Sequence, residues 1–173
     1  DAEGDFQAMM RRAVLAGWCL LVLAPPATAH PAPFSYLDLA LTSEGVDGSL
    51  VLHDFDVAHD FGIEPPERLL DPTFSAKYRD QLTALMDTRL ALFLDGRRAS
   101  LTWTGFETVP ERQSLRLTFR TGDASPGRVH VNTVLFPYDP IHQTFINVYE
   151  DGQLRHQAIL AEQRPAMDYY AGT

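Results

Sequence analysis

The sequence predicts a mainly β fold: an antiparallel β-sandwich of immunoglobulin-like architecture with one inserted α-helix near residues 72–87. Three observations support this prediction. Several segments alternate apolar and polar residues, which is the period of a strand with one buried face. Two Asp-Gly pairs separate such segments, as they do in short β-hairpins. A single segment instead shows the spacing of an amphipathic helix.

The N-terminal residues indicate that the protein is exported. Arg11 and Arg12 precede an apolar run at 13–23, and small residues follow it up to Ala29. A basic start, a short apolar run and an A-x-A ending are typical of a cleaved secretory signal peptide. We therefore interpret the chain as three parts: upstream residues 1–8, a signal peptide 9–29 and an extracytoplasmic domain 30–173. The expected location is the periplasm or the cell envelope.

Cysteine usage and charge limit what this domain can do. The apolar run is shorter than the about 20 residues that a membrane-spanning helix needs. It contains Cys19, the one cysteine, so the domain has no disulfide and must be stabilised by core burial. The net charge of −9 makes nucleic acid and anionic lipid head groups unfavourable partners. We expect neither nucleic-acid binding nor direct lipid binding.

Alternating segments account for about eight strands. The most regular segment is 114–120, where leucine and phenylalanine occupy one face and arginine the other. Residues 37–42 alternate in the same way, and 128–136 form a further run. That run ends at Pro-Tyr-Asp-Pro, residues 137–140, which predicts a turn.

Two hairpins are predicted from the Asp-Gly pairs. Asp95-Gly96 lies between the apolar runs 90–94 and 101–103, and Asp151-Gly152 lies between 145–149 and 153–160. Asp and Gly tolerate the positive φ angles that a two-residue hairpin turn requires. Each pair therefore marks a tight reversal of the chain.

One segment, expected between the second and third strands, has helical spacing. Its apolar side chains are Phe74, Tyr78, Leu82 and Leu85. Asp71 is a suitable N-cap, and Pro72 is favoured at the first helical position. We expect a helix over 72–87 that covers part of the sandwich.

Histidines and aspartates gather at residues 53–60, and these residue types bind transition metals. We interpret the segment through Val57 as a strand, which places His53 and Asp54 on opposite faces. His53 is then a half-buried structural histidine. His59 and Asp60 lie beyond the expected strand end and are candidate ligands for a divalent metal.

His30 is a third candidate ligand if the leader is cleaved after Ala29. Its free amine and its ring nitrogen can then chelate one ion such as nickel, cobalt or copper. Pro31 lacks an N–H, so a site built from successive deprotonated amides is excluded. The alternative is that His30 is simply the frayed first residue of the domain. His130, His142 and His156 lie apart in the sequence, and we expect a structural role for each, with His142 exposed after the turn.

Motifs of catalysis are absent from the sequence. It contains neither H-E-x-x-H nor G-x-S-x-G, and no glycine-rich phosphate loop. The expected domain also lacks a cysteine to act as a nucleophile. We predict that the protein is not an enzyme.

Two segments resemble the soluble extracytoplasmic region of HupE/UreJ-type membrane proteins. Residues 29–39, Ala-His-Pro-Ala-Pro-Phe-Ser-Tyr-Leu-Asp-Leu, look like its opening. Residues 135–149, which include Phe-Pro-Tyr-Asp-Pro followed by a strand, resemble its closing part and are the more specific match. The resemblance extends over residues 30–173.

The resemblance implies a link to nickel or cobalt uptake. In that family the soluble region precedes a bundle of membrane helices, so the expected partner is a membrane permease domain, the missing C-terminal part of the same chain. The domain would then be tethered to the inner membrane. The histidines and aspartates that the family associates with metal passage lie in its membrane part, and no residue of this sequence corresponds to them.

Three hypotheses of function follow from the sequence. The first is metal handling by His30, His59 and Asp60 beside a permease. The second is a structural or protein-docking module without metal, with Tyr138, Asp139 and His142 as the docking residues of the turn. The third is a periplasmic copper-binding protein that uses the N-terminal His30.

Overall fold

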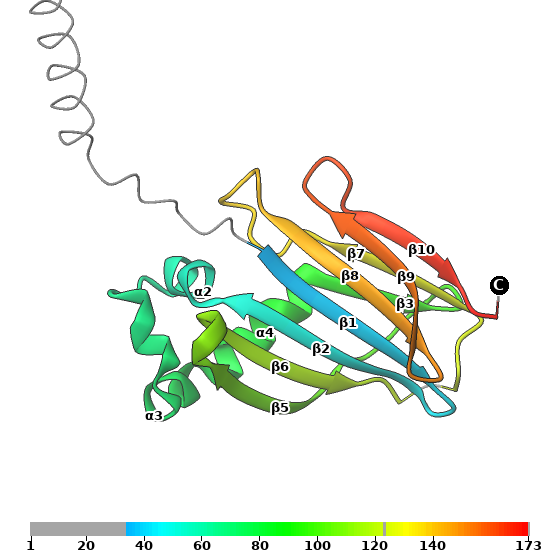
Figure 1. Ribbon diagram of the computed structural model, residues 1–173, viewed down its shortest axis with the longest axis horizontal. Coiled ribbons are helices and arrows are strands. Elements are labelled where there is room, and N and C mark those ends of the chain that lie inside the picture. The colour runs from blue at the N-terminus through cyan, green and yellow to red at the C-terminus, as the bar shows by residue number, and fades with distance from the viewer. Residues whose placement is uncertain (1–33, 123, 173) are drawn as a thin grey trace, which may run out of the picture. The chain divides into compact units, whose positions relative to one another are not determined.

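The computed structural model describes residues 34–122 and 124–172, which belong to the second of two units of the chain, residues 32–173. This unit is a β-sandwich (Figure 1). Its larger sheet has the order β5-β6-β2-β1-β8-β9. The bounds of these strands are β1 Phe34–Thr42, β2 Gly45–His53, β5 Thr102–Val109, β6 Ser114–Arg120, β8 Gln143–Glu150 and β9 Gln153–Leu160.

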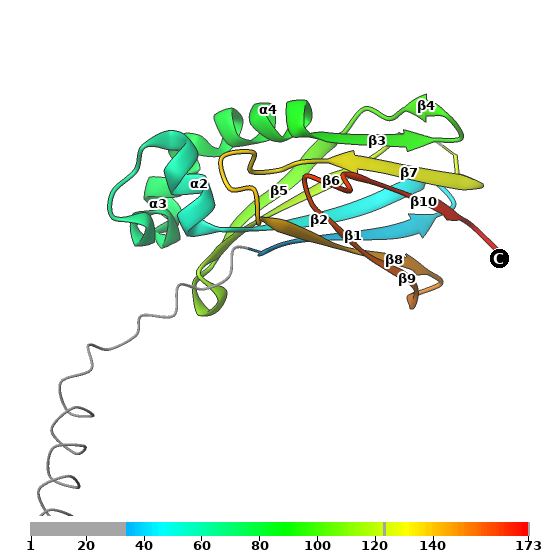
Figure 2. The ribbon, with the colours of Figure 1, turned by 90° about the horizontal axis from the view of Figure 1, so that it is seen from above.

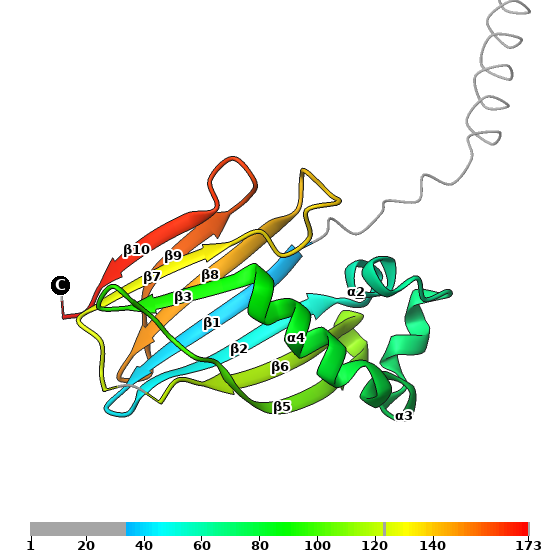
Figure 3. The ribbon, with the colours of Figure 1, turned by 180° about the vertical axis from the view of Figure 1, so that it is seen from behind.

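The second layer combines a smaller sheet with a helix. The sheet has the order β10-β7-β3-β4, with bounds β3 Leu90–Leu94, β4 Arg97–Arg98, β7 Arg128–Thr133 and β10 Ala166–Tyr170. Helix α4, Arg79–Arg89, runs directly into β3 and lies in the same layer (Figure 2). Seen from behind, α4 lies over β2 and β6 (Figure 3). The predicted β-sandwich is therefore confirmed.

The core fills the space between the two layers. Inner-face side chains of the larger sheet are fully buried, among them Leu37, Leu50, Leu52, Leu115, Leu117, Ile146 and Val148. Leu92 and Val131 meet them from the smaller sheet, and Leu82 and Met86 from α4. Leu115 and Leu117 of the alternating segment 114–120, and Leu82 of the helical segment, are among the residues that the sequence patterns assign to a buried face.

Local turn and cap predictions are also confirmed. Asp95-Gly96 and Asp151-Gly152 have φ angles of 50°, 80°, 52° and 72° and close the β3–β4 and β8–β9 hairpins. The Asp71 side chain accepts hydrogen bonds from the backbone N–H groups of Thr73 and Phe74, with Pro72 at the first helical position. The predicted helix is interrupted, however. It consists of α3 Pro72–Ser75, a 3-10 turn Ala76–Tyr78 and α4.

The strand interpretation of residues 53–57 is wrong. Strand β2 ends at His53, where its pairing with β6 also ends, and a helix follows: α2, Asp54–Phe61. The His53 ring accepts a hydrogen bond from the Phe55 N–H and caps α2, while Gly62, at φ 63°, ends it. Asp54 and Asp56 lie in the first turn, where the helix dipole favours negative charge. Because His53 caps a helix, residues 54–57 are helical rather than the strand that their alternating pattern suggests.

Two further features differ from the sequence prediction. The described residues form ten named strands rather than about eight. Strand β1 pairs with β8 in parallel, with Tyr36 opposite Phe145, although all the other strand pairs are antiparallel. This parallel pair brings the start of β1 beside the start of β8, and therefore beside the 137–142 turn. Among the described residues, no helix is long and apolar enough to cross a membrane.

Candidate functional site

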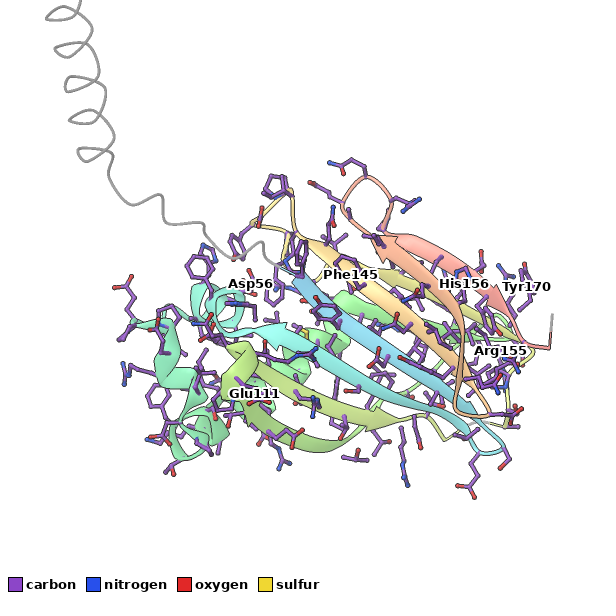
Figure 4. All side chains as sticks on the ribbon, in the orientation of Figure 1. Asp56, Glu111, Phe145, Arg155, His156 and Tyr170 are labelled. Carbon is purple, nitrogen blue, oxygen red and sulfur yellow. The ribbon has the colours of Figure 1, made fainter. Side chains whose placement is uncertain are left out.

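A buried polar network joins three elements at one end of the sandwich. Asp56 of α2 has no exposed surface, and its Oδ1 accepts a hydrogen bond of 2.5 Å from the Tyr138 hydroxyl. His142, just before β8, is 6% exposed, and its Nε2 is hydrogen-bonded to Ser35 Oγ of β1 at 3.1 Å. Figure 4 shows Asp56 at this end of the molecule. The network therefore links β1, α2 and the 137–142 turn.

Two atoms of the network face each other without a hydrogen bond. His142 Nδ1 and Asp56 Oδ2 are 3.6 Å apart, and neither has a hydrogen-bond partner among the described residues. This distance is too long for a normal hydrogen bond. Phe136 packs edge-on against the His142 ring at 4.9 Å between centroids, which helps to keep the imidazole away from water.

Burial decides the charge of each group in the network. Burial raises the pKa of Asp56, while the hydrogen bond from Tyr138 acts in the opposite direction. Burial, and then the hydrogen bond to Asp56, raise the pKa of Tyr138, so the phenol keeps its proton. Burial lowers the pKa of His142 to about 4. The imidazole is therefore neutral at pH 7.

The contacts Ser35–His142–Asp56 follow the same order as in the triad of serine hydrolases. Ser35 and Asp56, however, have no exposed surface. The cavity beside His142 has a volume of about 10 Å³, which is room for one water molecule at most. Among the described residues, the arrangement holds three elements together and keeps the serine hydroxyl away from solvent.

His59 and Asp60 do not converge on one point. The His59 ring is exposed and stacks on Tyr138, with centroids 3.6 Å apart and planes inclined by 14°. Asp60 forms an ion pair with Arg89 of α4, which also donates to the Leu135 carbonyl at 2.7 Å. Across the described part of the chain, no three His, Cys, Asp or Glu residues are arranged to hold a metal ion. His30, the third candidate ligand, lies outside the described residues.

Two apolar side chains next to residues of this network are exposed to solvent. Phe55 of α2 is 51% exposed and Ile141 of the turn is 74% exposed. Together with His59 and Tyr138 they form what we call the α2–turn surface. A groove of about 670 Å³ lies beside α2 and is lined by Phe55, His59, Ile63, Pro65 and Pro66, among others. An exposed apolar surface with an adjoining groove is typical of a contact site for another molecule.

The three docking residues predicted from the sequence differ in their burial and contacts. Tyr138 is half-buried, with its ring on His59 and its hydroxyl on Asp56. Asp139 shapes the turn, since its Oδ1 accepts from the Ile141 N–H at 3.0 Å. The expectation that His142 is exposed is wrong, because the chain turns inward at this residue as it enters β8.

The sequence interpretation missed four residues of this site: Ser35, Phe55, Asp56 and Ile141. A helical interpretation of residues 54–61, ended by Gly62, would have placed Phe55 and His59 one turn apart on the same face. No sequence signal marks Ser35, because its partner His142 is 107 residues away.

The fold and this site define a β-sandwich domain with an exposed apolar surface, the α2–turn surface, next to a buried polar network. Comparison with known proteins adds no family to this description. No protein-family model matches the chain, and a search of curated proteins finds no significant match.

Proposed function

We propose that this chain is a non-enzymatic docking module, the extracytoplasmic domain of a HupE/UreJ-like protein linked to nickel or cobalt uptake. Its partner is the membrane permease part of that protein, and its contact site is the α2–turn surface. The observation that carries the proposal is that Phe55 of α2 and Ile141 of the turn are exposed, while buried Asp56 of α2 holds Tyr138 of the same turn in place.

Rigidity is what makes this surface suitable for docking. A side chain that is already fixed loses little conformational entropy when a partner binds. Tyr138 is fixed at its hydroxyl by Asp56 and along its ring by His59. The turn is held further by Asp139 and by His142, which anchors it to β1. Phe55 and Ile141 are therefore presented on a preorganised base.

The composition of the surface also supports a protein partner. Aromatic residues and exposed aliphatic residues at the centre of a contact carry much of the energy of protein interfaces. Of the acids of α2, Asp54 and Asp56 are buried and Asp60 is already paired with Arg89. A partner that covers Phe55 would therefore not have to desolvate a free Asp60 carboxylate.

Site-specific photocrosslinking in the native host tests the proposal. A photoreactive phenylalanine replaces Phe55 or Ile141, and a matched control replaces Leu154, which is 46% exposed on β9. We expect Phe55 and Ile141 to crosslink to a multi-spanning membrane segment identified by mass spectrometry, and Leu154 not to do so. Equal crosslinking at all three positions, or none at Phe55 and Ile141, would overturn the proposal.

A second measurement connects the surface with uptake. Phe55→Asp and Ile141→Asp place a charge in the contact, and each should weaken docking by about tenfold or more, as for a central interface residue. Nickel or cobalt accumulation by the cells should fall in both variants and stay normal in Leu154→Asp. Normal accumulation in all three variants would contradict the link to uptake.

A further inference from the structure

Two buried polar atoms face each other where α2 meets the 137–142 turn. Asp56 Oδ2 and His142 Nδ1 are 3.6 Å apart, and neither has a hydrogen-bond partner among the described residues. Asp56 has no exposed surface and His142 is 6% exposed. A buried polar atom without a partner costs free energy. The Asp56–His142 pair is therefore an incomplete contact within a hydrogen-bonded network.

The contact lacks one proton. His142 Nε2 is bonded to Ser35 Oγ, and a neutral imidazole carries a single N–H. When that N–H is at Nε2, both Nδ1 and Asp56 Oδ2 are acceptors and cannot bond to each other. The opposite tautomer would aim an N–H at the carboxylate, and such a buried pair would approach more closely than 3.6 Å. One added proton between the two atoms instead makes a hydrogen bond of about 2.8 Å.

Burial favours the uptake of one proton and opposes a second. Without the proton the buried pair carries the negative charge of Asp56, and with it the pair is neutral overall. Burial accordingly raises the pKa of Asp56 and lowers the pKa of His142 to about 4. The negative charge of Asp139 raises the pKa of both groups, whereas the Tyr138 hydrogen bond and His53 lower that of Asp56. The charged and titratable groups on the elements packed around the pair are Asp54 and Asp60 of α2, His53 and His59 at its two ends, Tyr138 and Asp139 of the turn, Arg89 of α4, and Glu162 beside the His142 cavity.

We propose that the Asp56–His142 pair is a proton-sensitive contact that regulates the α2–turn surface. When the pair takes up one proton, a hydrogen bond forms between Oδ2 and Nδ1 and draws the turn against α2. Phe55 of α2 and Ile141 of the turn are then held more rigidly relative to each other at acidic pH than at neutral pH. This inference rests on the proposed function, because it adds a control to the same docking site.

An NMR titration of the full chain, without any partner, tests the contact. The probes are the ring nitrogens of His142, the side-chain carboxyl carbon of Asp56 and a methyl group of Ile141, followed between pH 7 and pH 4. We expect one midpoint common to all three probes, because the pair shares one proton. On the acidic side of that midpoint, the exchange protection of the His142 N–H, which is bonded to the Asp139 carbonyl at 3.1 Å, should be about tenfold higher. Separate midpoints, or an Ile141 methyl that does not respond, would overturn the proposal.

Asp56→Asn is the matched variant, because it places an amide N–H where the added proton would lie. The Tyr138 hydroxyl needs an acceptor, so the asparagine presents Oδ1 to Tyr138 and directs Nδ2 at His142 Nδ1 at every pH. We expect the His142 N–H of this variant to be as protected at pH 7 as in the acidified natural chain. The titration of the natural chain needs no substitution, so it decides the proposal even if this variant fails to fold.

Glu162→Gln is the control, since Glu162 lines the cavity beside His142. This variant should keep the pH response of the natural chain, and Asp56→Asn should lose it. A response that survives in Asp56→Asn or disappears in Glu162→Gln would show that another group takes up the proton, and would overturn the proposal.

The regulation and the docking fail in different ways. Photocrosslinking at Phe55 should give more product at pH 5 than at pH 7 in the natural background, and equal amounts at both pH values with Asp56→Asn. Crosslinking that is equal at both pH values in the natural background would overturn the regulation and leave the docking proposal standing. A common NMR midpoint without crosslinking at either pH would overturn the docking proposal and leave the proton-sensitive contact standing.

Discussion

The Tyr138 hydroxyl donates a 2.5 Å hydrogen bond to Asp56, a carboxylate without exposed surface. A carboxylate in the interior is costly unless its oxygens are hydrogen-bonded. Tyr138 satisfies one oxygen, and the second faces His142. The bond thus fixes the turn to α2 and reduces the cost of burying Asp56, so the shape of the α2–turn surface and the stability of the fold depend on the same contact.

Tyr138→Phe tests this dependence. It keeps the ring on His59 and removes the hydroxyl, which leaves Asp56 Oδ1 without its donor. We expect the free energy of unfolding to fall by about 1–3 kcal/mol, as for a buried group left unsatisfied. Urea denaturation measures this change. Tyr149→Phe, at a tyrosine whose hydroxyl is not part of the network, should change stability by only about 0.5 kcal/mol or less. Equal effects of the two substitutions would contradict the role of the Asp56 contact.

His142 should make stability depend on pH. Burial lowers the pKa of His142 in the fold to about 4, below its ordinary value of 6.5, so the folded state disfavours the protonated ring. Stability contributed in this way is lost as the pH falls from 6.5 towards 4, by at most about 3 kcal/mol. The raised pKa of Asp56 acts in the opposite direction and reduces the net slope.

Denaturation curves of His142→Gln between pH 7 and pH 4 provide the measurement. The variant cannot take up a proton at this position, so its stability should fall less than that of the natural chain over this range. His156→Gln serves as the control, because His156 is more exposed and lies outside the network. If His142→Gln and the natural chain lose stability in parallel, His142 is not the titrating group.

Local patterns in the sequence were sufficient for much of the fold. The face of residues 114–120 that carries Leu115, Leu117 and Phe119 is buried, as the alternation predicts. The Asp-Gly hairpins and the Asp71 cap are confirmed because each depends on neighbouring residues only. The parallel pairing of β1 with β8 joins residues more than 100 positions apart, and no local pattern specifies it.

The site was harder to predict than the fold for a physical reason. Aspartate is usually exposed and histidine is intermediate, so residue type alone places neither Asp56 nor His142 in the interior. Only the tertiary fold brings the Tyr138 hydroxyl and Ser35 to them and makes their burial tolerable. The alternation at residues 53–57 also fits a strand. In the structure His53 caps helix α2 instead, so residues 54–57 are helical.

Gly48 is predicted to be irreplaceable in β2. A Cβ atom at this position would lie 2.0 Å from the Phe119 ring, a buried side chain of the core. Gly48→Ala therefore forces Phe119 or the sheet to move, and overpacking of this kind costs about 1–3 kcal/mol. Thermal denaturation should show a clear drop in Tm. Gly122→Ala is the matched control, since nothing lies within 4 Å of its added Cβ. A Tm unchanged by Gly48→Ala would mean that the ring adjusts freely.

Asp60 is predicted to affect stability rather than metal affinity. Its carboxylate is paired with Arg89, both side chains are mostly buried, and Arg89 also holds the Leu135 carbonyl. Asp60→Asn should therefore lower the free energy of unfolding by about 1–3 kcal/mol, as for loss of a charged hydrogen bond. Calorimetry with nickel, cobalt, copper and zinc on a chain processed to begin at His30 measures the other property. Any affinity found there should be unchanged in Asp60→Asn and His59→Ala, and be abolished when the His30 α-amine is blocked. A loss of metal binding in Asp60→Asn or His59→Ala would instead return these two residues to the metal hypothesis.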